Sequence, residues 1–351
     1  MKLNGKEMTK ADVLRRTGNI DQIAYVRKVT LSEGKGEGIR LYEIANGSGI
    51  EFSLQESKCL DILDMKYKGE NLRLLAKTGP VAETRADNRG INYLRSISGG
   101  FMYTCGLSNV GKEYEDGIAR HYNHGRVRFI PAEKVSASAA WEGDEYKISV
   151  KGEMRDSGFF NDNLVLRREI YTSVGEKGFH IRDVVENEGF SKQPIMIMYH
   201  MNLSYPLIDK NCEFFATESG YMPIPGSEAE EDRRLEITDP VDGYDETGYL
   251  YTVSSKNGKA FAGVYNKEKK LGILISFEDK NLPYLLEWKS MRSGDYAFGI
   301  MPTNCHIMGR EKENELGTLK YIESFEKLCY NIDVTVIDGD DEYNEIKKVL
   351  K

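Results

Sequence analysis

Hydrophobic and polar residues alternate along most of the chain. In the segment EYKISVKGEM, Tyr146, Ile148 and Val150 alternate with lysines and a serine, and residues 163–189 repeat this alternation on both sides of a turn at 175–178. A repeat of two is the pattern of a strand with one buried face. Similar apolar segments predict further strands at QPIMIMYHMN, AFAGVYN, LGILISFED, YLLEWKSM, DYAFGIMP and LCYNIDVTVID.

Helical periodicity is limited to the two ends of the chain. A short helix is predicted at about 10–16, with Thr9 as its N-cap and Gly18 as its stop. A second helix is predicted at 340–351, where acids come first and lysines last, as the helix dipole favours. Short strands joined by Gly, Asn and Asp turns fill the rest, and they predict a mainly β protein built as a large antiparallel sandwich.

Composition and charge narrow the organisation and the partners. The chain has no linker rich in Pro, Gly or Ser, so we expect a single domain over 1–351, with 1–22 as a helical extension packed on it. The net charge is -8 and the basic residues are scattered, which argues against nucleic acid as a binding partner. No apolar run approaches a membrane span and the N-terminus lacks a signal-peptide core, so we expect a cytoplasmic protein without membrane contact. The five cysteines are dispersed and predict reduced thiols.

The five histidines are the first candidates for chemistry. His121 and His124 are three residues apart, but their surroundings do not predict a helix and no third ligand is near in sequence, so we expect no metal. His200 shares one parity of a strand with Met198 and Asn202, and a histidine there is commonly a hydrogen-bonded core residue. However, His124 and His200 each lie where a strand gives way to a loop, and such rims are where β scaffolds carry sites.

Charged residues also alternate in the segment LVLRREIY. Arg167, Arg168 and Glu169 could bind an anion. The alternative, which this pattern favours, is a strand face exposed to solvent.

A series of motifs spans nearly the whole chain in a fixed order. SGGFMYTCGLSNVG is followed by NHGRVRFIPAEKV, NLVLRREI, MYHMNLSYPLI and LEWKSMRSGDYAFGIMPTNCHIMGR. With its T-C-G-L, H-G-R, P-A-E, Y-H-x-N and P-x-N-C elements, the chain resembles the aldose 1-epimerase-like proteins of the domain-of-unknown-function 4432 group. This group belongs to the galactose mutarotase-like β-supersandwich superfamily. The resemblance implies a sugar-binding cleft on the concave face of the sandwich.

The resemblance also implies roles for individual residues. Mutarotation needs a base for the anomeric hydroxyl and an acid for the ring oxygen. His200 matches the general acid of mutarotases, and His124 matches a second pocket histidine that binds or polarises the sugar. Arg126 would orient a hydroxyl or a carboxylate, and Asn202 and Trp288 would form walls. Trp288 could instead be a core aromatic.

Two positions depart from the family pattern. Met301-Pro302 stands where relatives typically carry Glu-Pro, and a thioether cannot replace that glutamate as the base. Lys58 stands where arginine is usual, which keeps the charge but loses the planar fork. Both side chains, with Asn304 of the P-x-N-C element, are expected to line the substrate pocket.

Glu287 could supply the missing base, depending on one hairpin register. If the turn within MRSGDY has two or four residues, Leu286 faces Met301 and Glu287 points to the other face of the sheet. A turn of three or five residues would place Glu287 opposite Met301, with Cβ atoms about 5 Å apart.

The sequence therefore predicts a protein that binds a monosaccharide or sugar derivative and acts as an epimerase or isomerase through histidine acid-base chemistry. One alternative is a sugar-binding protein that has lost catalysis with its base. Another is isomerisation or elimination on a modified sugar, with His124 and His200 as the proton-transfer pair. We expect no cofactor, and the sequence leaves a homo-oligomer open.

Overall fold

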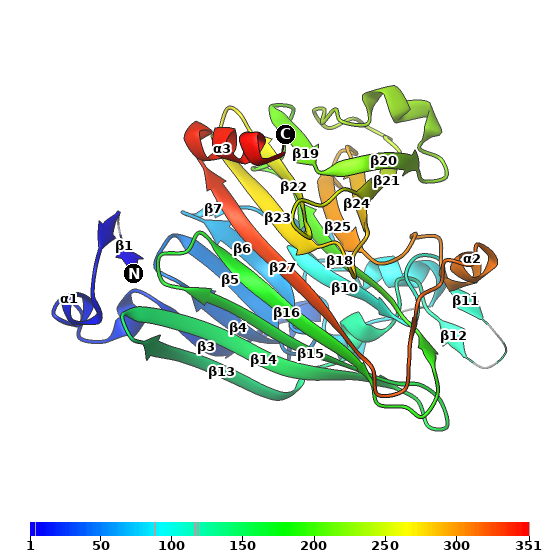
Figure 1. The fold of residues 1–351 in the computed structure, drawn as a ribbon, viewed down its shortest axis with the longest axis horizontal. Helices are drawn as coiled ribbons and strands as arrows, with labels where there is room; N and C mark the ends of the chain where they lie inside the picture. Colours follow the sequence, from blue (N-terminus) through cyan, green and yellow to red (C-terminus); the bar gives the residue numbers. More distant parts are fainter. Residues whose placement is uncertain (4, 88, 116, 118, 351) are drawn as a thin grey trace.

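The computed structural model describes residues 1–350 except 4, 88, 116 and 118. Among these described residues, an 11-stranded and an 8-stranded antiparallel sheet form two layers (Figure 1). The mainly β, antiparallel architecture predicted from the alternating pattern is confirmed. The predicted strand segments all contain strands of these two sheets.

The first sheet has the strand order β20 (Glu218–Pro223), β21 (Thr247–Val253), β24 (Tyr284–Ser290), β25 (Ala297–Thr303), β18 (Met196–Leu203), β10 (Met102–Leu107), β6 (Asp61–Tyr67), β5 (Ile50–Gln55), β4 (Arg40–Ala45) and β3 (Tyr25–Thr30). The short β7 (Glu70–Asn71) pairs with β6.

The second sheet has the order β13 (Glu133–Glu142), β14 (Glu145–Ser157), β15 (Asn163–Ser173), β16 (Gly178–Asn187), β27 (Lys327–Asp338), β23 (Leu271–Glu278), β22 (Lys259–Asn266) and β19 (Cys212–Ala216). Four small pairs complete the strands: β1 (Lys2–Leu3) with β2 (Lys6–Glu7), β8 (Leu74–Leu75) with β9 (Gly99–Gly100), β11 (Tyr114–Glu115) with β12 (Arg120–His121), and β17 (Gln193–Pro194) with β26 (Tyr321–Ile322).

The helices are short and lie outside the two sheets. Helix α1 (Lys10–Leu14) begins at Thr9, which forms a capping box with Asp12, so the predicted N-cap is confirmed. Helix α3 (Asp340–Leu350) closes the chain beside the end of β27 (Figure 1). Helix α2 (Arg310–Glu315) was not predicted. None of the helices formed by the described residues is long and apolar enough to cross a membrane.

The hydrophobic core lies between the two sheets. Alternate residues of the second sheet, such as Ile170 and Ile181, pack in one cluster with Tyr199 and Ile300 of the first sheet. The opposite face of the first sheet, here called the outer face, carries a smaller cluster that is also buried. Its members are Cys105, Val110, Met196, Met198, Leu250, Leu286, Met301 and Cys305. Strand β18 is therefore buried on both faces.

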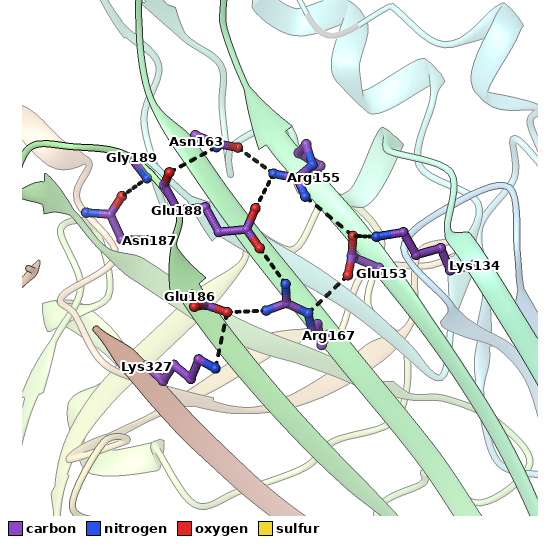
Figure 2. Close-up of polar contacts among 10 residues, drawn as sticks. All are labelled: Lys134, Glu153, Arg155, Asn163, Arg167, Glu186, Asn187, Glu188, Gly189 and Lys327. Carbon is purple, nitrogen blue, oxygen red and sulfur yellow. Dashed lines mark hydrogen bonds and ion pairs between the residues drawn. The ribbon is translucent and has the colours of Figure 1, made fainter. Parts of the chain in front are cut away.

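Neighbouring arginines on β15 point to opposite sides of the second sheet. Arg167 lies on the solvent side, where it contacts Glu153, Glu186 and Glu188 (Figure 2). Arg168 points inward and is fully buried, so the solvated-face interpretation is wrong for this residue. The period of two of a strand produces this difference between adjacent positions.

Candidate functional site

His200 and His124 meet on the outer face of the first sheet. His200 lies on β18, and its ring centroid is 6.2 Å from that of His124, with the rings nearly perpendicular at 89°. His124 follows β12 in a left-handed backbone conformation, with φ of 56°. The strand and the loop thus bring together the two histidines that the sequence predicted as partners.

Two aromatic side chains form the walls beside His200. Tyr103 of β10 is the cross-strand partner of His200, and their rings stack with centroids 4.2 Å apart. Trp288 of β24 contacts His200 edge to face at 5.9 Å. The indole Nε1 of Trp288 donates to Glu246 Oε2 at 2.8 Å, which brings a carboxylate to this wall.

Arg128 lies beside the two histidines, where the sequence had predicted Arg126. The Arg128 guanidinium carbon lies 5.6 Å from the ring centroid of Tyr103 and 5.5 Å from that of Tyr93. Arg126 instead donates to Asp156 at 2.7 Å and lines a different cavity with His121. The two arginines of HGRVR are only two positions apart in a segment without regular periodicity, so the sequence alone did not separate them.

Both histidines are neutral near pH 7. Burial and the charge of Arg128 lower the pKa of His124 to about 3. Burial, then His124, then Arg128 lower the pKa of His200 well below its ordinary value. His124 Nδ1 accepts from the Gly111 amide at 3.3 Å, so the neutral ring carries its proton on Nε2. Within the described residues, His200 Nδ1 has no hydrogen-bond partner.

Met301 lies opposite His200 on the neighbouring strand. The pairs Met198–Thr303 and Met201–Ile300 set the register of β18 and β25, and this register aligns His200 with Met301. Met301 is fully buried, and a Cβ on Gly299 would lie 2.2 Å from the Met301 methyl carbon. The methyl group thus occupies space that only glycine at 299 leaves open.

Glu287 does not reach this position. The β24–β25 register pairs Leu286 with Met301 and Glu287 with Ile300, which is the outcome expected for an even-numbered turn. Glu287 lies on the face toward the main core, where the Tyr251 hydroxyl donates to it at 2.7 Å. Its pKa is raised to about 7 because the carboxyl is buried. The hypothesis that Glu287 replaces the missing base opposite His200 is therefore wrong.

The side chains of the two predicted asparagines form hydrogen bonds with backbone groups next to the site. The Asn202 amide donates to the carbonyl of His200 at 3.1 Å. The Asn304 amide donates to Ile195 O at 3.1 Å and accepts from Ile197 N at 2.8 Å. Both amides are therefore engaged in holding β18, which carries His200.

Lys58 lies in the turn between β5 and β6 and is 6% exposed. Its ammonium lies 5.4 Å from the ring centroid of Phe129. Lys58 and Arg128 line one cavity together with Tyr103, so Lys58 lies close to the histidine site.

His121 packs against a different set of residues from the two site histidines. It stacks on Tyr114, with ring centroids 5.9 Å apart, and lies against Arg310. The described residues contain no group of three or more His, Cys, Asp or Glu side chains that could hold a metal ion.

Known proteins share this fold. A candidate aldose 1-epimerase from Klebsiella pneumoniae subsp. pneumoniae MGH 78578 is 20% identical, with 95% of this chain and 90% of that chain covered and a TM-score of 0.88. Galactose 1-epimerase from Lactobacillus acidophilus NCFM is 12% identical, with 90% and 99% covered and a TM-score of 0.61. A galactose mutarotase-like protein from Clostridium acetobutylicum is 13% identical, with 90% and 99% covered and a TM-score of 0.60.

The sequence comparisons identify a family. Among the curated proteins, none matches the chain. The family model described as Domain of unknown function (DUF4432) matches residues 36–336, which is most of the sequence. The chain therefore belongs to the DUF4432 family and has the galactose mutarotase-like fold.

Proposed function

We propose that this protein binds a monosaccharide or a sugar derivative and catalyses a proton transfer on it, as an epimerase or isomerase. The observation that carries this proposal is the contact between His200 and His124 at a wall formed by Tyr103 and Trp288. Proteins with the same fold include one named galactose 1-epimerase, which supports a sugar as the ligand.

The protonation states suggest different roles for His200 and His124. His200 is neutral, so its imidazole can act as the base that accepts a proton from a sugar hydroxyl or C–H group. Its lowered pKa makes the resulting imidazolium a strong acid, which returns the proton to the ring oxygen or to a carbon. His124 would polarise a sugar oxygen with its Nε2 proton. The proton is returned, so the net reaction is an isomerisation.

Substitution of the histidines tests these catalytic roles directly. We expect His200→Ala to lower kcat/KM at least about a hundredfold, as loss of an acid-base group does. The readout is NMR exchange of anomers and product analysis across a panel of aldoses. His180→Gln, on the outer side of the second sheet, is the matched control. An unchanged rate in His200→Ala on a substrate that the native protein turns over would contradict the proposal.

The pH profile gives a second readout. Because the pKa of His200 is lowered, the base stays deprotonated as the pH falls through the ordinary histidine range near 6.5. We expect kcat/KM on a neutral sugar to remain level from pH 8 to about pH 5. A fall with a midpoint near 6.5 would show that the working base is an unperturbed histidine.

Met301 favours a second candidate function, a sugar-binding protein without turnover. It places a thioether opposite His200, where a catalytic carboxylate would be needed for the usual mutarotation. Calorimetry with the same sugars separates the two functions. Binding without faster anomer exchange or new product would favour the binding protein.

A further inference from the structure

A small cavity adjoins the histidine site and shares Tyr103 and Arg128 with it. Its volume is about 30 Å³, and its lining includes Gln55, Lys58 and Phe129. Tyr103 stacks on His200, so one side of the cavity lies directly behind the wall of the candidate site.

Two cations, Lys58 and Arg128, line this cavity together with one carboxylate, that of Asp61. Lys58 is 6% exposed and Arg128 is 4% exposed. Among the described residues, no carboxylate forms a salt bridge with either of them, although Glu83 and Asp61 act on Lys58 at longer range. Asp61 is engaged elsewhere, because it accepts from Thr104 and Arg168 at 2.6 and 2.9 Å. Burial of charges without partners is unfavourable, which points to a missing anionic ligand.

Individual buried polar atoms of the residues that line the cavity are also without partners. Within the described chain, Arg128 Nε and Nη1 donate to no acceptor, and Gln55 Oε1 accepts from no donor. The remaining Arg128 nitrogen, Nη2, donates to the Asn123 carbonyl at 3.3 Å, which holds the guanidinium in place. Buried donors of this kind are normally satisfied by protein, water or ligand.

We propose that this cavity binds the carboxylate of a sugar acid, with Arg128 and Lys58 as its cationic partners. The proposal rests on the proposed function, since the sugar ring would lie at Tyr103 and the two histidines. A water-sized sphere occupies about 10–15 Å³, so the cavity has room for about two oxygen atoms. That matches a carboxylate, whereas a phosphate ester presents three free oxygens. The substrate class is therefore a monosaccharide carrying a carboxylate, such as a hexuronate.

Calorimetry on the full-length protein tests this assignment. The probes are galacturonate and glucuronate, each compared with galactose or glucose, and galactose 6-phosphate. We expect at least one uronate to bind at least about tenfold more tightly than its neutral counterpart, as charge-assisted hydrogen bonds from arginine and lysine would give. Equal affinity of each uronate and its hexose, as water filling the cavity would give, would overturn the proposal, as would tighter binding of the phosphate ester.

Variants locate the effect in the cavity. Lys58→Met is expected to reduce the uronate preference about tenfold while leaving the weaker hexose binding nearly unchanged. Arg128→Met is also expected to reduce the uronate preference, but because Arg128 lies beside both histidines, its effect on hexose binding is measured separately. Lys58→Arg keeps the charge and should keep the preference. Retention of the full preference in both methionine variants would overturn the proposal, and if Arg128→Met does not fold, Lys58→Met alone decides.

Binding and turnover are read separately, so the two proposals fail separately. A uronate preference that depends on Lys58, without any turnover, would support the carboxylate site and contradict catalysis. Turnover of neutral sugars that depends on His200, without any uronate preference, would support catalysis and contradict the carboxylate site.

Discussion

Met301 and Gly299 occupy neighbouring positions on the outer face of β25. The methyl group of Met301 lies where a side chain on residue 299 would begin, so the two residues fit as a pair. The same space would accept a glutamate at 301, which is no bulkier than methionine. A glutamate placed at residue 301 can therefore test directly whether the missing base belongs at this position.

Met301→Glu is expected to raise the rate of anomer exchange on a bound aldose by at least about a hundredfold relative to Met301→Gln. The new carboxylate would lie opposite His200 and raise the pKa of that imidazole, which restores an acid beside a base. Met301→Gln has the same length without the charge and is the matched control. Equal exchange rates in the two variants, with both folded by circular dichroism, would exclude residue 301 as the base position.

Lys58 gives the proposed carboxylate binding a pH dependence. Burial, with a contribution from Arg128, lowers the pKa of Lys58 to about 8, while Glu83 and Asp61 oppose this shift. The ammonium is present below this pKa and is lost above it, so uronate affinity should weaken as the pH rises from 7 to 9. Calorimetry at both values checks this, and Lys58→Arg should show a level profile.

At the scale of residues, sequence reasoning found the chemistry more reliably than the geometry. His124 and His200 were predicted together because each was expected where a strand gives way to a loop. His124 does lie in a loop, whereas His200 lies within β18. Arg128 was missed in favour of Arg126, because their segment forms a short 3₁₀ turn whose direction depends on tertiary contacts. The face of the sheet on which Glu287 lies depends on the length of the hairpin turn, and the residues of MRSGDY did not determine that length.

At the scale of elements, the β24–β25 hairpin does more than position Trp288. Lys289 of β24 is 2% exposed, and its ammonium donates to the carbonyls of Arg233, Arg234 and Glu236 at 2.6–3.1 Å. These carbonyls belong to the long connection between β20 and β21, which also carries Glu246. One buried lysine thus fixes a segment that supplies a carboxylate to the site.

Lys289→Met is expected to lower the free energy of unfolding by about 3 kcal/mol, because it leaves three carbonyls and the buried Glu287 without their cation. Urea denaturation measures this change. Lys210→Met is the control, since its ion pair with Asp239 is exposed to solvent and its loss should leave the free energy of unfolding nearly unchanged. Similar stability of the two variants would show that the buried contacts of Lys289 contribute little.

The strands and the two terminal helices were predictable from the sequence, whereas helix α2 was not. The long strands carry their alternation within a few residues, so local sequence is sufficient. Helix α2 begins at Arg310, whose amide donates to Asn109 Oδ1 at 2.8 Å, and that acceptor is 201 residues away in the chain. A helix start that depends on so distant a partner leaves little local signal.

At the scale of the whole molecule, Arg168 links the two sheets through the core. From β15 it contacts Asp183 within the second sheet, and it crosses to Asp61 and Thr104 of the first sheet. Tyr199 of the first sheet donates to Asp183 and joins this network. The cross-sheet pairing of charges adds a specific alignment to the surrounding apolar packing.

Arg168→Met is expected to lower the free energy of unfolding by about 4 kcal/mol, because it leaves two buried carboxylates without their partner. Arg167→Met is the matched control on the adjacent residue, and its half-exposed ion pairs predict a loss of about 1 kcal/mol or less. Chemical denaturation of both variants provides the comparison. A larger loss for Arg167→Met would reverse the roles assigned to the inner and outer faces of β15.

The placement of the two tryptophans provides an optical reporter of the site. Trp141 lies on β13 beside Tyr146, whereas Trp288 contacts His200 and Glu246. In Trp141→Phe, tryptophan fluorescence, excited selectively over that of the tyrosines, would come from Trp288 alone, and a bound sugar should shift its emission or change its intensity. Titration would then read occupancy without a label, and a persistent signal change after further substitution of Trp288 by Phe would show that the emission arises elsewhere.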